Sequence, residues 1–528
     1  MVDFPTEDKC SDTSTKNKEL KELCDRLWTA ADELRANSAL RSTQYSTPVL
    51  GLIFIRYADY KFEETTNKLK KELSNKNQPI RKLDYLSECV YLTENARYNY
   101  LLNLPEEASL GKAIDNAMKS IEIENEELKD VLPKNYVGIG DKVLVNLIKL
   151  FHKIPTELDQ DIFGKIYEYF LGEFAKAEGQ GAGEFYTPTS IVRLIVEVIE
   201  PYQGRILDPA CGSGGMFVQS AEFVKEHLKN PYKEISIYGQ EKTDDIVRLC
   251  KMNLAIHGLS GDIKQGNTYY EDVFKMQGKF DFVMANPPFN VDKVDKEAIE
   301  DDPRYKYGIP SIDNANYLWI QIFSSMLNEN GRGGFVMANS ATDAGYSELD
   351  IRRKLIEKDE VDVIISVGSN FFFTVTLPVT LWFLNKAKKN SSGKVLFIDA
   401  RKIYNQIDRA HREFTNQQIE FISNIVRLFR KEKIETEKCS SSMIQEHFPN
   451  MNYQDIEGLC KVTTKADIEK HGWSLNPGRY VGVVKRKQES SDFSEMLRQY
   501  SEELELLDDE AHDLEAVISK NLKNLQEL

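Results

Sequence analysis

The chain lacks the cysteine patterns of zinc-binding and disulfide-rich proteins. Its seven cysteines are scattered along the sequence: Cys10, Cys24, Cys89, Cys211, Cys250, Cys439 and Cys460. None is spaced as Cys-x-x-Cys or lies near a His-x-x-x-His pattern, so we expect no metal site and a reducing, cytoplasmic environment. The first ten residues have neither a basic start nor an apolar run, and we therefore expect no secretory signal.

The sequence also lacks a phosphate-binding P-loop and an uninterrupted membrane span. None of its Gly-Lys pairs is followed by Ser or Thr in the required frame, which argues against a nucleotide-driven motor. No charged residue occurs between Val363 and Leu384, a stretch long enough to cross a bilayer, but several polar residues, Gly368 and Pro378 interrupt it. Two buried strands that flank a loop explain this stretch better.

Positive charge is in deficit. The chain has 68 Lys and Arg against 84 Asp and Glu, a formal net charge of −16. Affinity for nucleic acid depends on neutralising phosphates with basic side chains, so either DNA is not the substrate or another component helps to hold it. The 528 residues, 41% of them hydrophobic, are enough for two to four domains, and we expect one catalytic domain with appendages.

Periodicity divides the chain into three regions. Residues 1–160 show helical spacing, residues 161–420 alternate short apolar strands with helical stretches, and residues 421–528 are charged and helical apart from an apolar patch at 473–484. The expected strands are 205–208, 235–238, 280–284, 334–337, 361–365, 379–383 and 395–398. This alternation predicts an α/β fold: a doubly wound, mostly parallel sheet with helices on both faces and ligands beyond the carboxyl ends of its strands.

A glycine-rich loop follows the first expected strand. The strand ends at Asp208 and continues as Pro-Ala-Cys-Gly-Ser-Gly-Gly-Met before a helical stretch. Gly212, Gly214 and Gly215 allow a tight turn and the close approach of a ligand. The dinucleotide-binding pattern needs a further glycine where Phe217 stands, so NAD is disfavoured.

Two further segments favour a cofactor that contains adenosine. The next strand ends at Glu241, and an acid there can accept both ribose hydroxyls, although it could instead cap the following helix or pair with Lys242. Upstream, residues 179–190 are rich in glycine and lead into a helix for which Thr187 and Pro188 are suitable first residues. The amides of this loop could hold a carboxylate, or the loop could be an ordinary linker.

The third expected strand ends in the loop Asn286-Pro287-Pro288-Phe289. The Asn286 side-chain oxygen and the Pro287 carbonyl could each accept a hydrogen from an exocyclic amine, which would localise the amine's lone pair for attack on a methyl group. Phe289 could stack on the base, which must leave a duplex to reach such a site. The alternative is a simple proline-rich turn. No Pro-Cys dipeptide occurs, which disfavours a cysteine-based cytosine carbon-5 methylase.

Together these segments resemble the modification (methylation) subunit of type I restriction-modification systems, the HsdM family, over nearly the whole chain. The segments that carry the resemblance are 27–35, 50–55, 185–188, 208–215, 286–289, 316–319, 377–383 and 475–480. The resemblance implies a Rossmann-like, S-adenosylmethionine-dependent DNA methyltransferase that methylates the 6-amino group of adenine. It also implies a complex of two such subunits with one specificity subunit (HsdS), and a restriction subunit (HsdR) is a further candidate partner.

The resemblance also assigns site residues by position. It implies contacts with S-adenosylmethionine for Glu184, Phe185, Tyr186, Thr187, Pro188, Thr189, Asp208, Ser213, Gly214, Gly215 and Glu241. Asn267 falls where related methylases, which often carry Asp there, contact the cofactor adenine. The implied catalytic residues are Asn286, Pro287, Pro288 and Phe289.

The end of the chain follows a coiled-coil pattern. An unbroken four-three spacing joins Phe493, Leu497, Tyr500, Leu504, Leu507, Ala511, Leu514, Ile518, Asn521, Leu525 and Leu528. The pattern predicts a helical seam, and the resemblance favours a partner helix on the specificity subunit over a helix folded back on its own domain. Residues 491–528 carry eleven acids and three bases, so half of the net negative charge belongs to a tail that need not face DNA.

Three hypotheses therefore compete: an adenine methylase subunit, a methylase of the same fold acting on RNA or on protein glutamine, and a catalytically silent scaffold. Intact Asn286, Phe289 and Glu241 argue against a silent scaffold. The long helical N-terminal region and the tail favour an assembly subunit. We expect the acidic stretch 293–302 to be a solvated loop rather than a mobile lid.

Overall fold

A computed structural model of the chain describes residues 7–36, 42–74, 79–86, 88–105, 107–155, 161–178, 186–227, 229–311, 313–372, 377–408 and 411–483. Met1–Val481 form one compact unit. The predicted coiled-coil residues 493–528 lie outside the described residues, as do Glu184 and Phe185. Within the described ranges, no helix combines the length and the apolarity that a membrane crossing needs.

The N-terminal part is helical, as its periodicity predicts. Its helices are α1 (Glu7–Ala36), α2 (Ser42–Ser74), α3 (Lys82–Leu86), α4 (Tyr98–Leu102), α5 (Leu110–Glu124), α6 (Asp141–His152) and α7 (Ile162–Glu178). The apolar run at 49–55 is buried in α2, which packs against α6 and α7. Trp28 of α1 meets Phe170 and Phe174 of α7 edge-on, with ring centroids 5.4 and 4.9 Å apart, so α7 belongs to this helical core.

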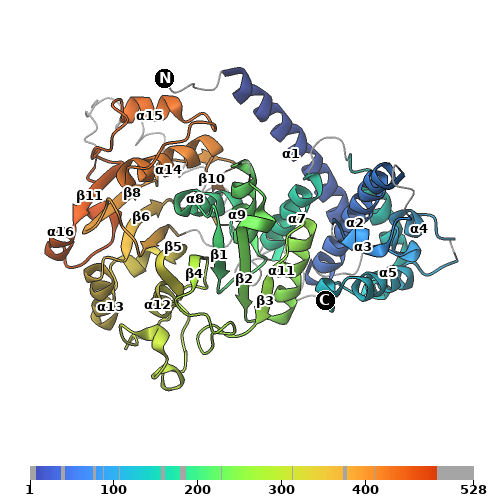
Figure 1. Ribbon diagram of the computed structural model, residues 1–528, viewed down its shortest axis with the longest axis horizontal. Coiled ribbons are helices and arrows are strands. Elements are labelled where there is room, and N and C mark those ends of the chain that lie inside the picture. Colours follow the sequence, from blue (N-terminus) through green and yellow to red (C-terminus); the bar gives the residue numbers. More distant parts are fainter. Residues whose placement is uncertain are drawn as a thin grey trace, which may run out of the picture. The chain divides into compact units, whose positions relative to one another are not determined.

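A nine-stranded sheet forms the other core (Figure 1). Its order is β11 (Cys460–Thr464), β8 (Lys394–Asp399), β6 (Val361–Val367), β7 (Val379–Asn385), β5 (Leu327–Ala338), β4 (Phe280–Ala285), β1 (Gly204–Asp208), β2 (Ile235–Glu241) and β3 (Asp262–Gln265). Neighbours are parallel except that β7 is antiparallel to β5 and β6, and β11 to β8. All seven expected strands are present, and the stretch 363–384 forms β6 and β7 with a loop between them, as predicted.

Helices cover both faces of this sheet. Successive residues of a strand point to opposite faces, so neighbouring residues pack against different helices. Ile206 of β1 packs in a cluster with α8 (Thr189–Ile199), α9 (Gly215–Glu226), α11 (Asp244–Ile256) and α14 (Asn416–Arg430). Its neighbour Leu207 packs in a cluster with α12 (Asn316–Met326), α13 (Tyr346–Glu357) and α16 (Lys465–Lys470). The predicted doubly wound α/β fold is confirmed. The short elements α10 (Pro231–Glu234), β9 (Asn405–Gln406), β10 (Arg412–Glu413) and α15 (Ser441–His447) complete it.

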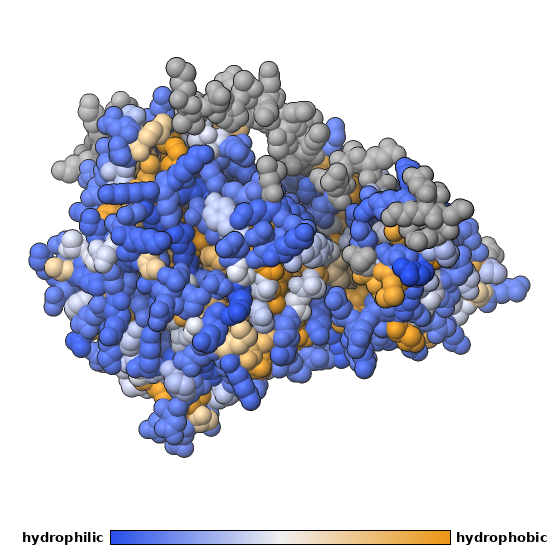
Figure 2. Space-filling view, viewed as in Figure 1, coloured by the Kyte–Doolittle hydropathy of each residue, from blue (hydrophilic) through white to orange (hydrophobic). Residues whose placement is uncertain are grey.

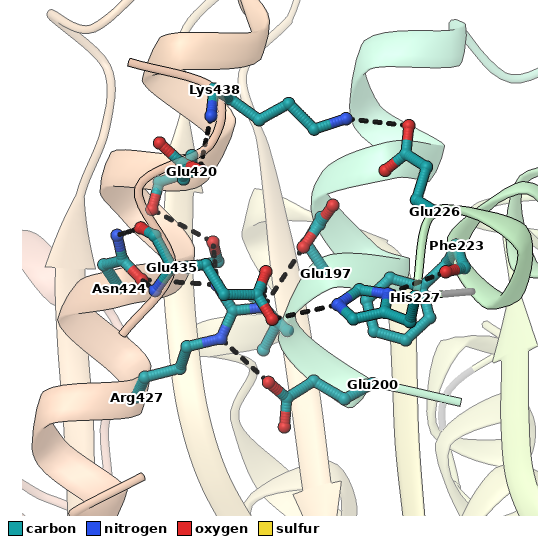
Figure 3. A network of polar contacts seen from close by, with 12 residues as sticks. Glu197, Glu200, Phe223, Glu226, His227, Glu420, Asn424, Arg427, Glu435 and Lys438 are labelled. Carbon is teal, nitrogen blue, oxygen red and sulfur yellow. Dashed lines mark hydrogen bonds and ion pairs between the residues drawn. The ribbon is translucent and has the colours of Figure 1, made fainter. Parts of the chain in front are cut away.

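Buried ion pairs attach α14 to α8 (Figure 3). The Arg427 guanidinium lies 2.8 Å from a Glu200 carboxylate oxygen, 3.2 Å from one of Glu197 and 3.1 Å from one of Glu435. Arg427 is only 2% exposed, so its charge needs these carboxylates. The first residue of α8, Thr189, is one of the predicted cofactor-binding residues. The network therefore holds the C-terminal part of the fold against a helix of the candidate site.

The prediction that the chain beyond residue 421 is helical apart from one apolar patch is wrong at β11. This strand, Cys-Lys-Val-Thr-Thr, adds to the edge of β8 through five antiparallel residue pairs. So short a strand carries little pattern of its own, and the unpaired edge of β8 determines its conformation. The face shown in Figure 2 is largely hydrophilic with small, separate hydrophobic areas, as expected when helices and edge strands cover the apolar sheet.

Candidate active site

A cleft of about 530 Å³, open to solvent, lies at the carboxyl ends of β1 and β4. These strands are neighbours, but the chain leaves β1 towards β2 and β3 on one side and returns to β4 on the other. The loops diverge at such a point and leave room for a ligand. The residues that line the cleft are Glu168, Leu171, Tyr186, Thr187, Thr189, Val192, Asp208, Ala210, Cys211, Gly212, Ser213, Gly215, Met216, Gln219, Asn253 and Asn286.

The glycine loop after β1 forms one wall of the cleft. Gly214 has a φ of 84°, and a Cβ there would lie 2.8 Å from the Cys250 sulfur, so the turn into α9 requires glycine. A Cβ on Gly215 would meet nothing within 4 Å, because the residue borders open space. Asn253 of α11 fixes the loop by donating from Nδ2 to the Ser213 carbonyl oxygen at 2.8 Å. The loop is thus held rigidly while it faces the cleft.

Two acids stand at the ends of β1 and β2. Asp208 lines the cleft, is 2% exposed, and accepts one hydrogen bond of 3.0 Å from the Ala210 amide. Burial raises the pKa of its carboxyl well above the usual range. Glu241 accepts hydrogen bonds from the amides of Lys242 at 2.8 Å, Thr243 at 3.3 Å and Gly212 at 3.2 Å. Burial also raises the pKa of Glu241, which those amides partly offset.

Glu241 is not among the cleft-lining residues, and its contacts match the structural alternative considered from the sequence: it caps the turn into α11. Thr243 occupies the N-cap position of that helix but makes no side-chain cap bond. The Gly212 contact nevertheless joins Glu241 directly to the glycine loop. The ends of β1 and β2 therefore form one connected unit.

The segment before α8 forms the opposite wall. Tyr186, Thr187 and Thr189 line the cleft, and Pro188 is the N-cap of α8, so the predicted start of this helix is confirmed. The Tyr186 hydroxyl lies 3.4 Å from the Thr189 hydroxyl. A Cβ on Gly172 of α7 would lie 3.1 Å from the Tyr186 oxygen, so glycine there leaves room for this ring. Burial raises the pKa of the Tyr186 hydroxyl to about 12, which keeps it protonated.

Asn286 reaches the cleft from the end of β4. Its side-chain oxygen Oδ1 is buried and has no hydrogen-bond partner among the residues that the structure describes. A buried amide oxygen without a partner costs about 1–3 kcal/mol. Because the same residue lines the cleft, this oxygen is placed to accept a hydrogen from a bound ligand.

The rest of the loop is placed differently. Pro287, Pro288 and Phe289 do not line the cleft, and the Phe289 ring packs against the sheet core. Asn290 has a φ of 54° and exchanges hydrogen bonds with Asn316 at the start of α12. The structure therefore brings together the predicted residues Asn286, Asp208, Ser213, Gly215 and the Tyr186–Thr189 segment, but leaves Phe289 beside them rather than within the cleft.

Asn267 also lies outside the cleft lining. Its side chain accepts from the Tyr269 amide at 3.2 Å, which makes a local turn. Arg304, 2% exposed, holds the following segment by donating to the carbonyl oxygens of Thr268 at 2.8 Å, Glu271 at 3.1 Å and Tyr269 at 3.3 Å. The acidic side chains of 293–302 are mainly exposed, as expected for a solvated loop, but the loop ends at this buried anchor.

Three polar cleft residues were not anticipated from the sequence: Glu168 of α7, Gln219 of α9 and Asn253 of α11. Each is a polar residue among buried apolar neighbours on its helix, which is the one signal that could have singled it out. Asn253 is 1% exposed, and its Oδ1 is a second buried oxygen without a partner. Helices therefore contribute polar groups to the cleft in addition to the loops.

Comparison with protein families identifies two matching regions. Residues 158–489 match the N-6 DNA Methylase family, and residues 23–151 match the HsdM N-terminal domain. The type I restriction enzyme MjaIX methylase subunit of Methanocaldococcus jannaschii is 39% identical over 96% of this chain and 91% of its own length. The type I restriction enzyme HindI methylase subunit of Haemophilus influenzae is 36% identical over 79% of this chain and 93% of its own length.

Solved structures agree on the fold. The crystal structure of a type I restriction-modification system methyltransferase subunit from Streptococcus thermophilus covers 88% of this chain and 99% of its own, with a TM-score of 0.72 and 21% identity. A modification subunit of a putative type I restriction enzyme from Vibrio vulnificus covers 88% and 96%, with a TM-score of 0.53 and 17% identity.

Proposed function

The chain belongs to the N-6 DNA methylase family, and we propose that it transfers a methyl group from S-adenosylmethionine to the 6-amino group of adenine in duplex DNA. The observation that supports this most directly is the Asn286 side-chain oxygen, buried without a partner, in the cleft that the glycine loop also lines. A bound ligand at this position would satisfy the acceptor. The family match and the methylase-subunit relatives support DNA over the alternative substrates considered from the sequence, RNA and protein glutamine.

The residues of the cleft suit S-adenosylmethionine, which would supply a reactive methyl group on a positively charged sulfur. Asp208 places a buried carboxylate against the cleft, which favours a cationic ligand. The open space at Gly215 and the start of α8, which has no side-chain cap, suit a ligand carboxylate. The residues proposed to hold the cofactor are Glu184, Phe185, Tyr186, Thr187, Pro188, Thr189, Asp208, Ser213, Gly214, Gly215 and, for the adenosine part, Glu241 and Asn267.

Catalysis would depend on the orientation of the target amine. Asn286 Oδ1 and the Pro287 carbonyl oxygen would each accept one amine hydrogen, which directs the nitrogen lone pair towards the methyl group. Phe289 would stack on the adenine once it has left the duplex, and this requires the ring to turn from its present packing against the core. Pro287 and Pro288 limit backbone freedom, so the two acceptors keep a constant separation.

The wider assembly forms part of the same proposal. We divide the chain into a helical N-terminal domain (1–160), a methyltransferase domain (161–420) and a C-terminal region (421–528), whose first part adds β11 and most of α14 to the sheet domain. The tail would pair with a helix of the specificity subunit (HsdS) in a complex with a second copy of this chain. A restriction subunit (HsdR) could join it. The specificity subunit would supply most of the phosphate contacts that this acidic chain lacks.

Product analysis tests the function. The chain and its specificity subunit are incubated with methyl-labelled S-adenosylmethionine and duplex DNA that contains the recognised sequence, and the digested nucleosides are separated. We expect label only in N6-methyladenine. Label in RNA or in protein glutamine, with none in DNA, would support the alternative, and label in no acceptor at all would support the scaffold.

A further inference from the structure

Glu168 brings a carboxylate into the cleft from a helix whose apolar residues pack in the N-terminal helical core and not in the core of the sheet. It lies on α7, which packs with the N-terminal helices, yet it lines the same cleft as Thr187, Asp208 and Asn286. Its neighbours Tyr167 and Phe170 are fully buried on α7. A charged residue next to them in a mainly apolar helix requires an explanation beyond solubility.

The carboxylate has no ion-pair partner among the described residues. Among the described residues its one hydrogen bond is a long contact of 3.3 Å from Gln219 Nε2 to Oε1, and none of them donates to Oε2. His257, Gln219 and Arg193 lower the pKa of the Glu168 carboxyl, and Asp161 raises it. Burial outweighs them and raises the pKa of Glu168 above its usual range. The side chain therefore has spare capacity to bind a cation.

We propose that Glu168 binds the α-ammonium group of the methionine part of S-adenosylmethionine. This inference depends on the proposed function. An ammonium group carries three hydrogen-bond donors, whereas the sulfonium carries none, so the free Oε2 matches the former. Asp208, the other carboxylate in the cleft, likewise accepts one hydrogen bond, from the Ala210 amide to Oδ1, so the Asp208→Asn variant below is needed to distinguish the two acids. Glu168 faces the cleft beside Tyr186 and Thr189, the wall expected to hold the amino-acid end of the cofactor.

A consequence is that the N-terminal helical core and the cofactor site share one helix. The aromatic residues Phe170 and Phe174 attach α7 to Trp28 of α1, and Glu168 faces the other way, to α9. A cofactor bound in the cleft would thus make a charge-assisted hydrogen bond to α7, the helix that also packs against the N-terminal helices.

Binding of three ligands to the full-length chain separates the groups involved. S-adenosylmethionine has both the sulfonium and the ammonium, S-adenosylhomocysteine has only the ammonium, and 5′-methylthioadenosine has neither. Dissociation constants are measured by calorimetry for the wild-type chain, Glu168→Gln and the control Glu173→Gln. Glu173 lies on the same helix but pairs with Lys176 instead of facing the cleft.

We expect Glu168→Gln to weaken S-adenosylmethionine and S-adenosylhomocysteine by the same factor, about tenfold or more, and to leave 5′-methylthioadenosine within twofold. Glu173→Gln should change none of them. Unchanged binding of both charged ligands to a folded Glu168→Gln chain, a loss confined to S-adenosylmethionine, or the same loss produced by Asp208→Asn instead would each overturn the inference. Failure of the wild-type chain to bind any of the three would instead contradict the proposed function itself.

Discussion

Asn290 and Asn316 hold each other by two reciprocal hydrogen bonds. The Asn290 amide donates to Asn316 Oδ1 at 2.9 Å, and Asn316 Nδ2 donates to Asn290 Oδ1 at 2.9 Å. Asn290 directly follows the loop Asn286–Phe289, and Asn316 is the first residue of α12. Asn316 is 3% exposed, so water cannot readily replace these bonds. The pair fixes the end of the proposed catalytic loop to the start of α12.

Replacement of Asn316 should therefore impair catalysis more than cofactor binding. Asn316→Ala leaves the Asn290 amide without its acceptor and loosens the loop, so we expect kcat to fall by about tenfold or more, with the dissociation constant of S-adenosylmethionine within about twofold. Asn314→Ala is the comparison variant: its bond to Asn290 Oδ1 is longer, at 3.1 Å, and exposed, while its Oδ1 accepts from the Asn316 amide at 2.9 Å, so we expect a smaller effect that leaves the reciprocal pair in place. Equal effects of the two variants would contradict this role for the reciprocal pair.

Arg304 should matter for both stability and the segment that carries Asn267. Arg304→Lys keeps the charge but cannot reach three carbonyl oxygens and Asp302 at once, so we expect a loss of about 2 kcal/mol in the free energy of unfolding. We also expect weaker binding of 5′-methylthioadenosine, because the adenosine side of the site is disturbed. Denaturant titration and calorimetry measure the two effects. Unaltered stability would show that the carbonyl contacts are dispensable.

His227 gives the fold a pH dependence. Nδ1 lies 2.7 Å from the Phe223 carbonyl oxygen and Nε2 lies 2.9 Å from a Glu435 carboxylate (Figure 3), so both nitrogens face acceptors and the doubly protonated ring fits best. Burial lowers the pKa of His227, but the carbonyl and Glu435 outweigh it and raise the value above its ordinary 6.5.

The stabilisation from His227 should be complete below pH 6.5 and lost as the pH rises through the raised pKa. His227→Gln should therefore cost about 1 kcal/mol at pH 5.5 and much less at pH 9, a modest value because the pair is partly exposed. Thermal unfolding at both pH values measures this. A double-mutant cycle with Glu435→Gln provides the control, and a coupling that does not shrink at high pH would contradict the assignment.

The tail should be required for assembly and not for cofactor binding. A chain that ends at Val483 keeps every described element but lacks the predicted coiled-coil seam. We expect it to bind S-adenosylmethionine like the full chain and to lose its complex with the specificity subunit in gel filtration. Retention of the complex would mean that the tail folds back on its own domain.

The sequence predicted the centre of the sheet better than its edges. Strands such as Val361–Val367 are buried on both faces and are therefore rich in apolar residues, with Asp362 and Ser366 the exceptions in this one. The edge strands Asp262–Gln265 and Cys460–Thr464 carry few apolar residues and form because a neighbouring strand offers an unpaired edge. That information lies in the tertiary structure and not in the local pattern.

The same distinction applies to the site. Asp208, Gly214 and Asn286 were predictable because each lies in a short continuous segment, so the residues that identify the motif are next to one another in the sequence. Glu168 and Asn253 reach the cleft from helices far away in sequence, so only the packing of α7 and α11 reveals them. Phe289 shows the limit of such motifs. The sequence identified an aromatic residue that could stack on a base, but it did not show that the ring packs against the sheet core.

Asn286 provides the most direct test of the central claim. The chain is assembled with its specificity subunit, and methyl transfer to adenine in duplex DNA is measured beside S-adenosylmethionine binding for wild type and Asn286→Ala. The unpartnered Oδ1 predicts that binding remains within about twofold while transfer falls by at least about a thousandfold. Methyl transfer by Asn286→Ala at close to the wild-type rate would show that the catalytic loop lies elsewhere.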